Sequence, residues 1–164
     1  DLLLDAKVLQ QTIDQTVQRA FASLDSRLVL TRGAEGEPGR KTTGHDLLRT
    51  TLEHKEKNAV SRLFRLLGLA FPTEDFAQIH RQLRGTKDQR ATSLELIDGI
   101  LVNPLRSAVR GLVDEISEDE WTLVARHYQF TRKKDYDDLL ESLKDNESEV
   151  VREVARFHLQ ELAA

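Results

Sequence analysis

Residues 71–104 read FPTEDFAQIHRQLRGTKDQRATSLELIDGILVNP, and the turn residues within this stretch decide the fold. Pro72 ends one helical segment, because proline disfavours the α conformation in the residue before it. Gly85 then separates two stretches in which the apolar residues follow a helical spacing. The pattern predicts two short helices joined by a tight turn, over about residues 74–84 and 88–102.

Side chains that can cap a helix recur through the rest of the chain. Thr86 with Gln89, and Ser117 with Glu120, have the spacing of a capping box. Two other expected caps are Thr73, before the first short helix, and Asn146, before the last. Further helices are expected over about residues 105–115, 118–129, 134–144 and 147–163. The first helices of successive pairs begin about 30 residues apart, and so do the second helices. This period predicts an α-solenoid of antiparallel helix pairs, in which each pair buries its apolar face against the next pair.

Two longer helices are expected to precede these pairs. The first keeps its apolar residues on one face, namely Ala6, Leu9, Ile13, Val17, Ala20, Leu24 and Leu28. Three glycines and a proline within residues 33–41 then predict a flexible loop, which is expected to cover residues 33–44. Thr43 is expected to cap the second long helix, which ends near Pro72. The predicted organisation is a helix over 1–32, this loop, and a helical repeat region over 45–164, within a single domain.

The composition supports an all-α fold and restricts the functions open to the chain. Only 5% of the 164 residues are aromatic, so the core must consist mainly of Leu, Val, Ile and Ala, which suits helices. The net charge of −4 argues against nucleic-acid binding, which needs a basic surface. The absence of Cys excludes thiolate chemistry and fits a reducing compartment. No apolar run is long enough to span a bilayer.

We find no motif for catalysis, and we expect no enzymatic activity, no cofactor and no metal site. The histidines lack the four-residue spacing of a helical metal site, and each is interpreted as packed or on the surface: His45, His54, His80, His127 and His158. The acidic clusters over 118–120 and 135–138 lie at expected helix starts, where negative charge is favourable. The basic run over 132–134 is interpreted as a solvated turn, with contact to anionic lipid or nucleic acid as the alternative.

Residues 139–162, LLESLKDNESEVVREVARFHLQEL, resemble a HEAT repeat. In that family an apolar helix leads to a turn that contains Asp, and a second helix then opens with Val-Arg-x-x-Ala. Asp145, Val151, Arg152 and Ala155 occupy these places. The resemblance implies that Asp145 accepts hydrogen bonds from amides of the turn, that Arg152 binds the turn or the next repeat, and that Ala155 permits close helix packing.

Residues 88–94 repeat this theme, with Arg90 and Ser93 in the Arg and small-residue places. Arg90 is therefore expected, like Asp145 and Arg152, to have a structural role between repeats. The middle pair has no Arg over 121–125, and its membership depends on spacing alone.

A narrower resemblance covers about residues 46–115. It is carried by the strings RLFRLLGL over 62–69 and LELID over 94–98, together with Pro72, Asp75, Arg90 and Ala91. These strings are similar to soluble HEAT-like regions of bacterial membrane proteins, in which the region follows a unit resembling the ATP/ADP translocases. The resemblance implies a cytoplasmic part of a larger transporter-like protein, membrane-associated through its parent. The absence of Met, even at position 1, also predicts a piece of a longer protein.

The leading functional hypothesis is a non-catalytic interaction or regulatory module. Its partner would be another protein or the adjacent transmembrane domain of the same polypeptide. Arg126 and Arg156 lie on the second helices of their pairs, which form the concave face of a solenoid, and are expected to bind this partner. One alternative is a ligand-binding or enzyme domain with a pocket between the two long helices. Another is a structural spacer.

Overall fold

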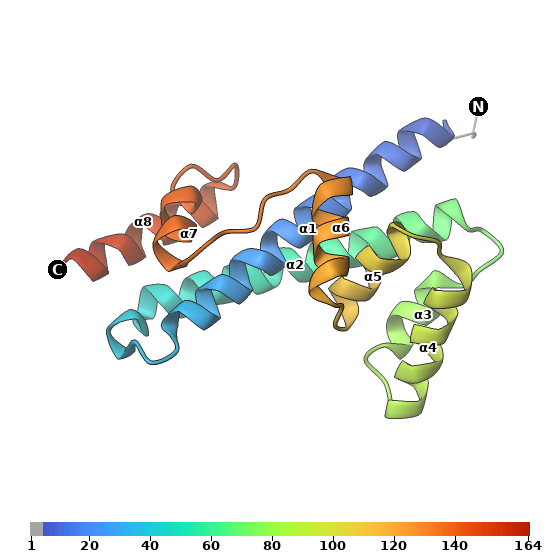
Figure 1. The fold of residues 1–164 in the computed structure, drawn as a ribbon, viewed down its shortest axis with the longest axis horizontal. Coiled ribbons are helices and arrows are strands. Elements are labelled where there is room, and N and C mark those ends of the chain that lie inside the picture. Colours follow the sequence, from blue (N-terminus) through green and yellow to red (C-terminus); the bar gives the residue numbers. More distant parts are fainter. Residues whose placement is uncertain (1–4) are drawn as a thin grey trace. The chain divides into compact units, whose positions relative to one another are not determined.

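The computed structural model describes residues 5–164, and all the regular structure in this range is helical. No strand occurs there, which confirms the predicted all-α class. Figure 1 shows the helices in chain order. Their bounds are α1 Ala6–Ala34, the 3-10 helix η1 Pro38–Arg40, α2 Thr43–Ala70, α3 Phe76–Gln82, α4 Lys87–Ile100, α5 Leu105–Val113, α6 Glu118–Tyr128, α7 Tyr136–Leu143 and α8 Glu149–Ala163.

The two long helices differ from the prediction at their ends. Helix α1 continues to Ala34, and the first four residues of the predicted helix over 1–32 lie outside the described part of the chain. Helix α2 begins at Thr43, which was expected to be its cap. The cap is instead Thr42, whose hydroxyl accepts a hydrogen bond from the amide of His45 at 3.3 Å.

The helix caps further along the chain confirm two predictions and correct two. The capping boxes at the starts of α4 and α6 are both formed. Asp75, rather than Thr73, caps α3, because its carboxylate accepts from the amide three residues on, at 3.0 Å. Ser148, rather than Asn146, caps α8 by the same type of contact at 3.4 Å.

The described residues form two compact units, and both long helices contribute to each. Unit 1 contains residues 5–21 and 58–130, and therefore helices α3 to α6. Unit 2 contains residues 22–57 and 131–164, and therefore α7 and α8. The three predicted helix pairs are thus divided, with two pairs in unit 1 and one pair in unit 2.

Unit 1 has a core in which an aromatic cluster and a close helix contact are prominent. Phe21 is fully buried, and its ring stacks on Phe130 at 5.2 Å and meets the edge of Trp121 at 5.1 Å. Ser93 is also fully buried and donates a hydrogen bond to the carbonyl of Ile79 at 3.0 Å. This small side chain allows α4 to pack closely on α3.

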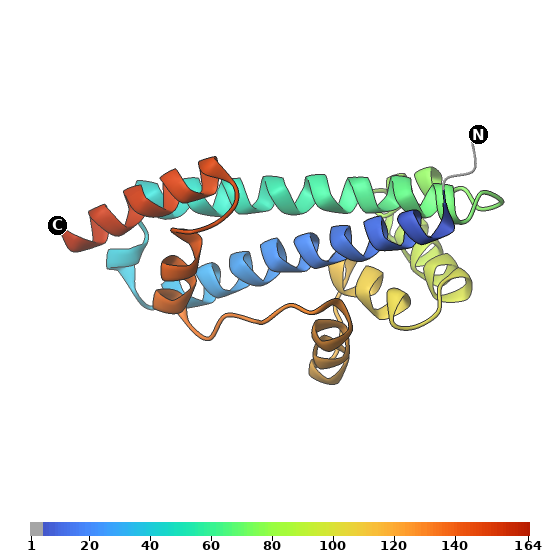
Figure 2. The ribbon, with the colours of Figure 1, turned by 90° about the horizontal axis from the view of Figure 1, so that it is seen from above.

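Unit 2 has its own apolar core, made by α7, α8 and the adjoining halves of the long helices. In Figures 1 and 2 the segments 22–34 of α1 and 43–57 of α2 lie side by side. Arg27 and Glu56 join these two segments by an ion pair of 2.6 Å. The buried core residues are Leu30, Ala34, Leu48, Leu52, Tyr136, Leu139, Leu140, Leu143, Val151 and Ala155.

Candidate functional site

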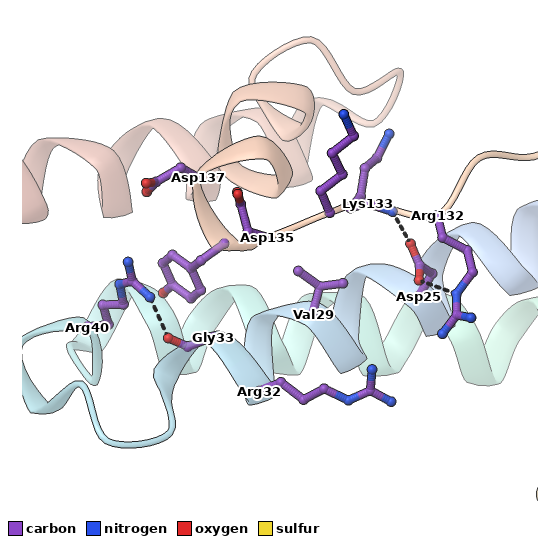
Figure 3. Close-up of a pocket in the computed structure, with 11 residues that line it drawn as sticks. Asp25, Val29, Arg32, Gly33, Arg40, Arg132, Lys133, Asp135 and Asp137 are labelled. Atoms are coloured by element: carbon purple, nitrogen blue, oxygen red, sulfur yellow. Dashed lines mark hydrogen bonds and ion pairs between the residues drawn. The ribbon is translucent and has the colours of Figure 1, made fainter. Parts of the chain in front are cut away.

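A charged groove of about 630 Å³ in unit 2 is the candidate functional site (Figure 3). One wall is the C-terminal half of α1, and the other is the segment 132–137, which leads into α7. Val29 and Gly33 contribute nonpolar surface to the groove, and the almost fully buried Tyr136 lies at its edge. The remaining lining residues are five cations and three aspartates, so the groove is a strongly polar feature.

The segment 132–137 is held against α1 by a buried carboxylate. Asp25 is only 4% exposed, and its Oδ2 accepts a hydrogen bond from the amide of Lys133 at 2.8 Å. Its Oδ1 lies 3.6 Å from Nε of Arg132. Asp135 then caps α7 by accepting from the amide of Asp138 at 2.9 Å. Asp25 binds only the backbone amide of Lys133. The ammonium group of Lys133 is therefore available to a ligand.

The opposite end of the groove is organised by Arg40. Its Nη1 donates to the carbonyl of Gly33 at 2.6 Å, and its guanidinium lies 4.5 Å from the centre of the Tyr136 ring. This is a favourable cation–π geometry. A Cβ atom on Gly33 would lie 2.5 Å from Cδ2 of Tyr136, so the ring can approach α1 only because this residue is glycine.

The carboxylates of the groove mostly have partners within the described part of the chain, whereas most of its cations do not. Among residues 5–164, the side chains of Arg32, Lys133 and Lys134 have no ion pair or hydrogen bond. Two of the three carboxylates, those of Asp25 and Asp135, have the partners described above. The groove therefore presents a surplus of unpaired positive charge.

A buried polar network lies behind the groove and has Tyr136 at its centre. The Tyr136 hydroxyl lies 2.6 Å from Nε2 of His158 and 3.0 Å from Nδ1 of His45. Tyr136 is 2% exposed, His158 0% and His45 6%. These three side chains come from α7, α8 and α2, so the network links three helices of unit 2.

The network continues from His158 to a carboxylate on the same helix. Nδ1 of His158 lies 3.0 Å from the hydroxyl of Thr42, which donates to Glu161 at 2.8 Å. The amide of Gly44 also donates to Glu161, at 2.8 Å. Burial acts to raise the pKa of Glu161, but the hydrogen bonds from Thr42 and Gly44 have the larger combined effect, and the net pKa is lowered. The carboxylate is therefore ionised at neutral pH.

The hydrogen positions in this network follow from the donors available. Since Thr42 uses its only hydroxyl proton on Glu161, it must accept from Nδ1–H of His158. Nε2 of His158 then accepts from the hydroxyl of Tyr136, whose oxygen accepts from Nδ1–H of His45. This assignment satisfies each of these groups with both imidazoles neutral.

The titration behaviour of the buried groups agrees with this assignment. Burial lowers the pKa of His45, and the neighbouring His158 lowers it further. Burial also lowers the pKa of His158, although the carboxylate of Glu161, whose Oε1 lies 3.5 Å from Nδ1, opposes the change. Burial raises the pKa of Tyr136 to about 12. Neutral imidazoles and a protonated phenol are therefore the stable forms at neutral pH.

Acidification is expected to destabilise unit 2 through the two buried histidines. Their folded-state pKa values lie below the ordinary value of 6.5, so the unfolded chain binds more protons. The two histidines make their full contribution to the free energy of unfolding above pH 6.5. As the pH falls below 6.5 this contribution is lost, by at most about 1.4 kcal/mol per pH unit for each histidine. Urea unfolding between pH 8 and pH 5 measures this slope. Equal stability at pH 7.5 and pH 5.5 would contradict the network.

The predicted structural residues have different positions. Arg90 donates to the carbonyl of Leu83 at 3.2 Å and to that of Val113 at 2.5 Å, and so connects the α3–α4 turn to the end of α5. Arg152 donates at 2.8 Å to the carbonyl of Asn146, within the α7–α8 turn of its own pair. The side chain of Asp145 is exposed.

The predicted partner-binding residues do not come together in one described surface. Arg126 is exposed on α6 in unit 1, and Arg156 is exposed on α8 in unit 2. Arg156 makes an ion pair with Glu153 at 3.3 Å. Neither arginine lines the groove. The groove also differs from the pocket expected between the two long helices, because its second wall is the segment 132–137.

Sequence reasoning did not identify the groove or Tyr136. The run over 132–134 is visibly basic, but no local pattern in the sequence predicts that it lies beside Asp25 of α1. Tyr136 has its two histidine partners 91 and 22 positions away, beyond any helical spacing. The interpretation of His45 and His158 as packed residues agrees with their burial.

No protein family, curated protein or solved structure matches the chain. The assignment of a function therefore depends on the geometry of unit 2. Within the described range, no helix has both the length and the apolar character needed to cross a membrane.

Proposed function

We propose that this chain is a non-catalytic helical interaction module, which binds a protein partner through the charged surface of unit 2. The observation that carries the proposal is the groove with three cations unpaired among residues 5–164, namely Arg32, Lys133 and Lys134. Unpaired cations around a groove raise the rate of association with an oppositely charged partner and select against others. The segment anchored by Asp25 carries two of these cations, Lys133 and Lys134.

The wider setting is part of the same proposal. We infer that the helix pairs stack in a HEAT-like manner and that the module is a cytoplasmic part of a larger, transporter-like membrane protein. The contacts of Arg90 between consecutive pairs and the burial of Ser93 and Ala155 support the HEAT-like arrangement. The partner is then another protein or the transmembrane domain of the same polypeptide, and Arg126 and Arg156 are further candidate contacts.

The enzyme alternative has less support from the geometry. The network of Glu161, His158, Tyr136 and His45 contains groups that transfer protons in enzymes. Its groups satisfy one another, however, and the Tyr136 hydroxyl is directed to the buried histidines rather than to the groove. This arrangement favours a structural role for the network.

Photo-crosslinking in cells that make the whole protein tests the proposal. A photoreactive amino acid is placed in turn at positions 134, 126 and 156, with position 57 on α2 as a control. We expect position 134 to give a defined protein adduct, within another protein or within the parent polypeptide, at a yield about tenfold above position 57. Equal background at all four positions would support the spacer hypothesis and overturn the proposal.

A further inference from the structure

We propose that the groove of unit 2 binds an acidic segment of the partner, an extended run of Asp and Glu side chains. This inference depends on the proposed function, because it specifies the chemistry of the partner. The groove and its three unpaired cations, Arg32, Lys133 and Lys134, are the features that carry it.

The first argument is electrostatic. Three of the five lining cations have no partner within the described chain, whereas Asp25 and Asp135 are already committed to amides. Asp137, the third carboxylate, extends away from Lys133 in Figure 3. A ligand with several carboxylates would thus meet unpaired ammonium and guanidinium groups, with which it can form charge-assisted hydrogen bonds.

The second argument is the distribution of the cations. In Figure 3 the side chains of Lys133 and Arg32 extend away from each other, one from the segment 132–137 and one from α1, with Val29 between these two walls. Positive groups on both walls are matched by a ligand whose negative groups are also spread out. An extended peptide with acidic side chains has this property, because successive side chains point in opposite directions. A single phosphate ion does not.

The third argument is the nonpolar surface between the charged walls. Val29, which is partly exposed, can contact the backbone and methylene groups of a peptide. A groove with two walls suits a chain better than the flat surface of a membrane.

Fluorescence anisotropy with the complete chain tests the inference. The probe is a short fluorescein-labelled peptide rich in Glu, and its control has Gln in place of every Glu. We expect the Glu peptide to bind and the Gln peptide to bind at least about tenfold more weakly. Binding of the Glu peptide should also weaken as salt is added, since exposed charges are screened. Equal binding of the two peptides, or no binding of either, would overturn the inference.

A matched pair of variants locates the binding site. Lys133→Glu/Lys134→Glu reverses two charges in the groove, and Lys55→Glu/Lys57→Glu makes the same change of charge on α2, outside the groove. We expect the first variant to lose at least about tenfold in affinity and the second less than about threefold. The milder Arg32→Gln and Lys133→Gln variants, with circular dichroism of each protein, distinguish loss of binding from loss of folding. Equal weakening by both double variants would contradict a site in the groove.

Two further probes separate the other sources of negative charge. Vesicles that contain phosphatidylserine test a membrane surface, and inorganic phosphate tests a small anion. Groove-dependent binding of vesicles without binding of the Glu peptide would overturn the inference in favour of lipid. Full displacement of the peptide by millimolar phosphate would overturn it in favour of a small anion. In either case a protein adduct at position 156, which lies in unit 2 outside the groove, would leave the proposed interaction module standing.

Discussion

Replacing Tyr136 with alanine is expected to lower the free energy of unfolding by about 4 kcal/mol, the loss typical of a large aromatic residue removed from a core. The side chain is 2% exposed, packs against Gly33 and Arg40, and provides the hydroxyl that joins His45 to His158. Urea unfolding followed by circular dichroism at pH 7.5 measures the change.

Phenylalanine at the same position separates packing from hydrogen bonding. Tyr136→Phe keeps the ring but leaves a nitrogen of each buried histidine without its partner, so we expect a smaller loss of about 2 kcal/mol. If Tyr136→Phe were as stable as the original chain, the hydroxyl would not be the centre of the network. If Tyr136→Ala cost less than about 1 kcal/mol, the residue would not be part of the core.

Replacing Gly44 with alanine is expected to lower the free energy of unfolding by about 3 kcal/mol, at the upper end of the cost of overpacking. A Cβ atom there would lie 2.2 Å from Oε1 of Glu161 and 2.9 Å from Cα of His158. The backbone atom cannot move away independently, so α8 would have to shift. The shift would also weaken the hydrogen bond from the Gly44 amide to Glu161.

Gly68→Ala is the matched control, because this glycine lies in the same helix and a Cβ there would meet nothing within 4 Å. We expect that change to raise the free energy of unfolding by about 0.5 kcal/mol, through the higher helix propensity of alanine. Differential scanning calorimetry of both variants tests the contrast. Similar melting temperatures for the two would show that α8 does not pack closely on Gly44.

The helices could be predicted because their signals are local in the sequence. Thr86 and Gln89 form a capping box through contacts only three residues apart, and Pro72 ends α2 through its own ring. Where two neighbouring residues could both cap a helix, the sequence did not distinguish them. Asp75 caps α3 in place of Thr73, and Thr42 caps α2 in place of Thr43, because the choice depends on where the first helical turn begins.

The candidate site could not be predicted because its contacts connect distant parts of the chain. Asp25 binds the amide of Lys133 across 108 positions, and Thr42 meets His158 across 116. Regular spacing identified α7 and α8 as a pair but did not specify what they pack against. Their core residues Leu139 and Val151 are buried in one cluster with residues of the long helices.

Tyr136 connects the groove of unit 2 to two buried histidines, so a change in the groove can be detected at those histidines. Tyr136 lies at the edge of the groove, and its hydroxyl is bound to His45 and His158 in the interior. A molecule that enters the groove and displaces the ring must also change the magnetic environment of those two imidazoles. The nuclear resonances of their ring protons would then register occupancy without any label, even though neither histidine lines the groove.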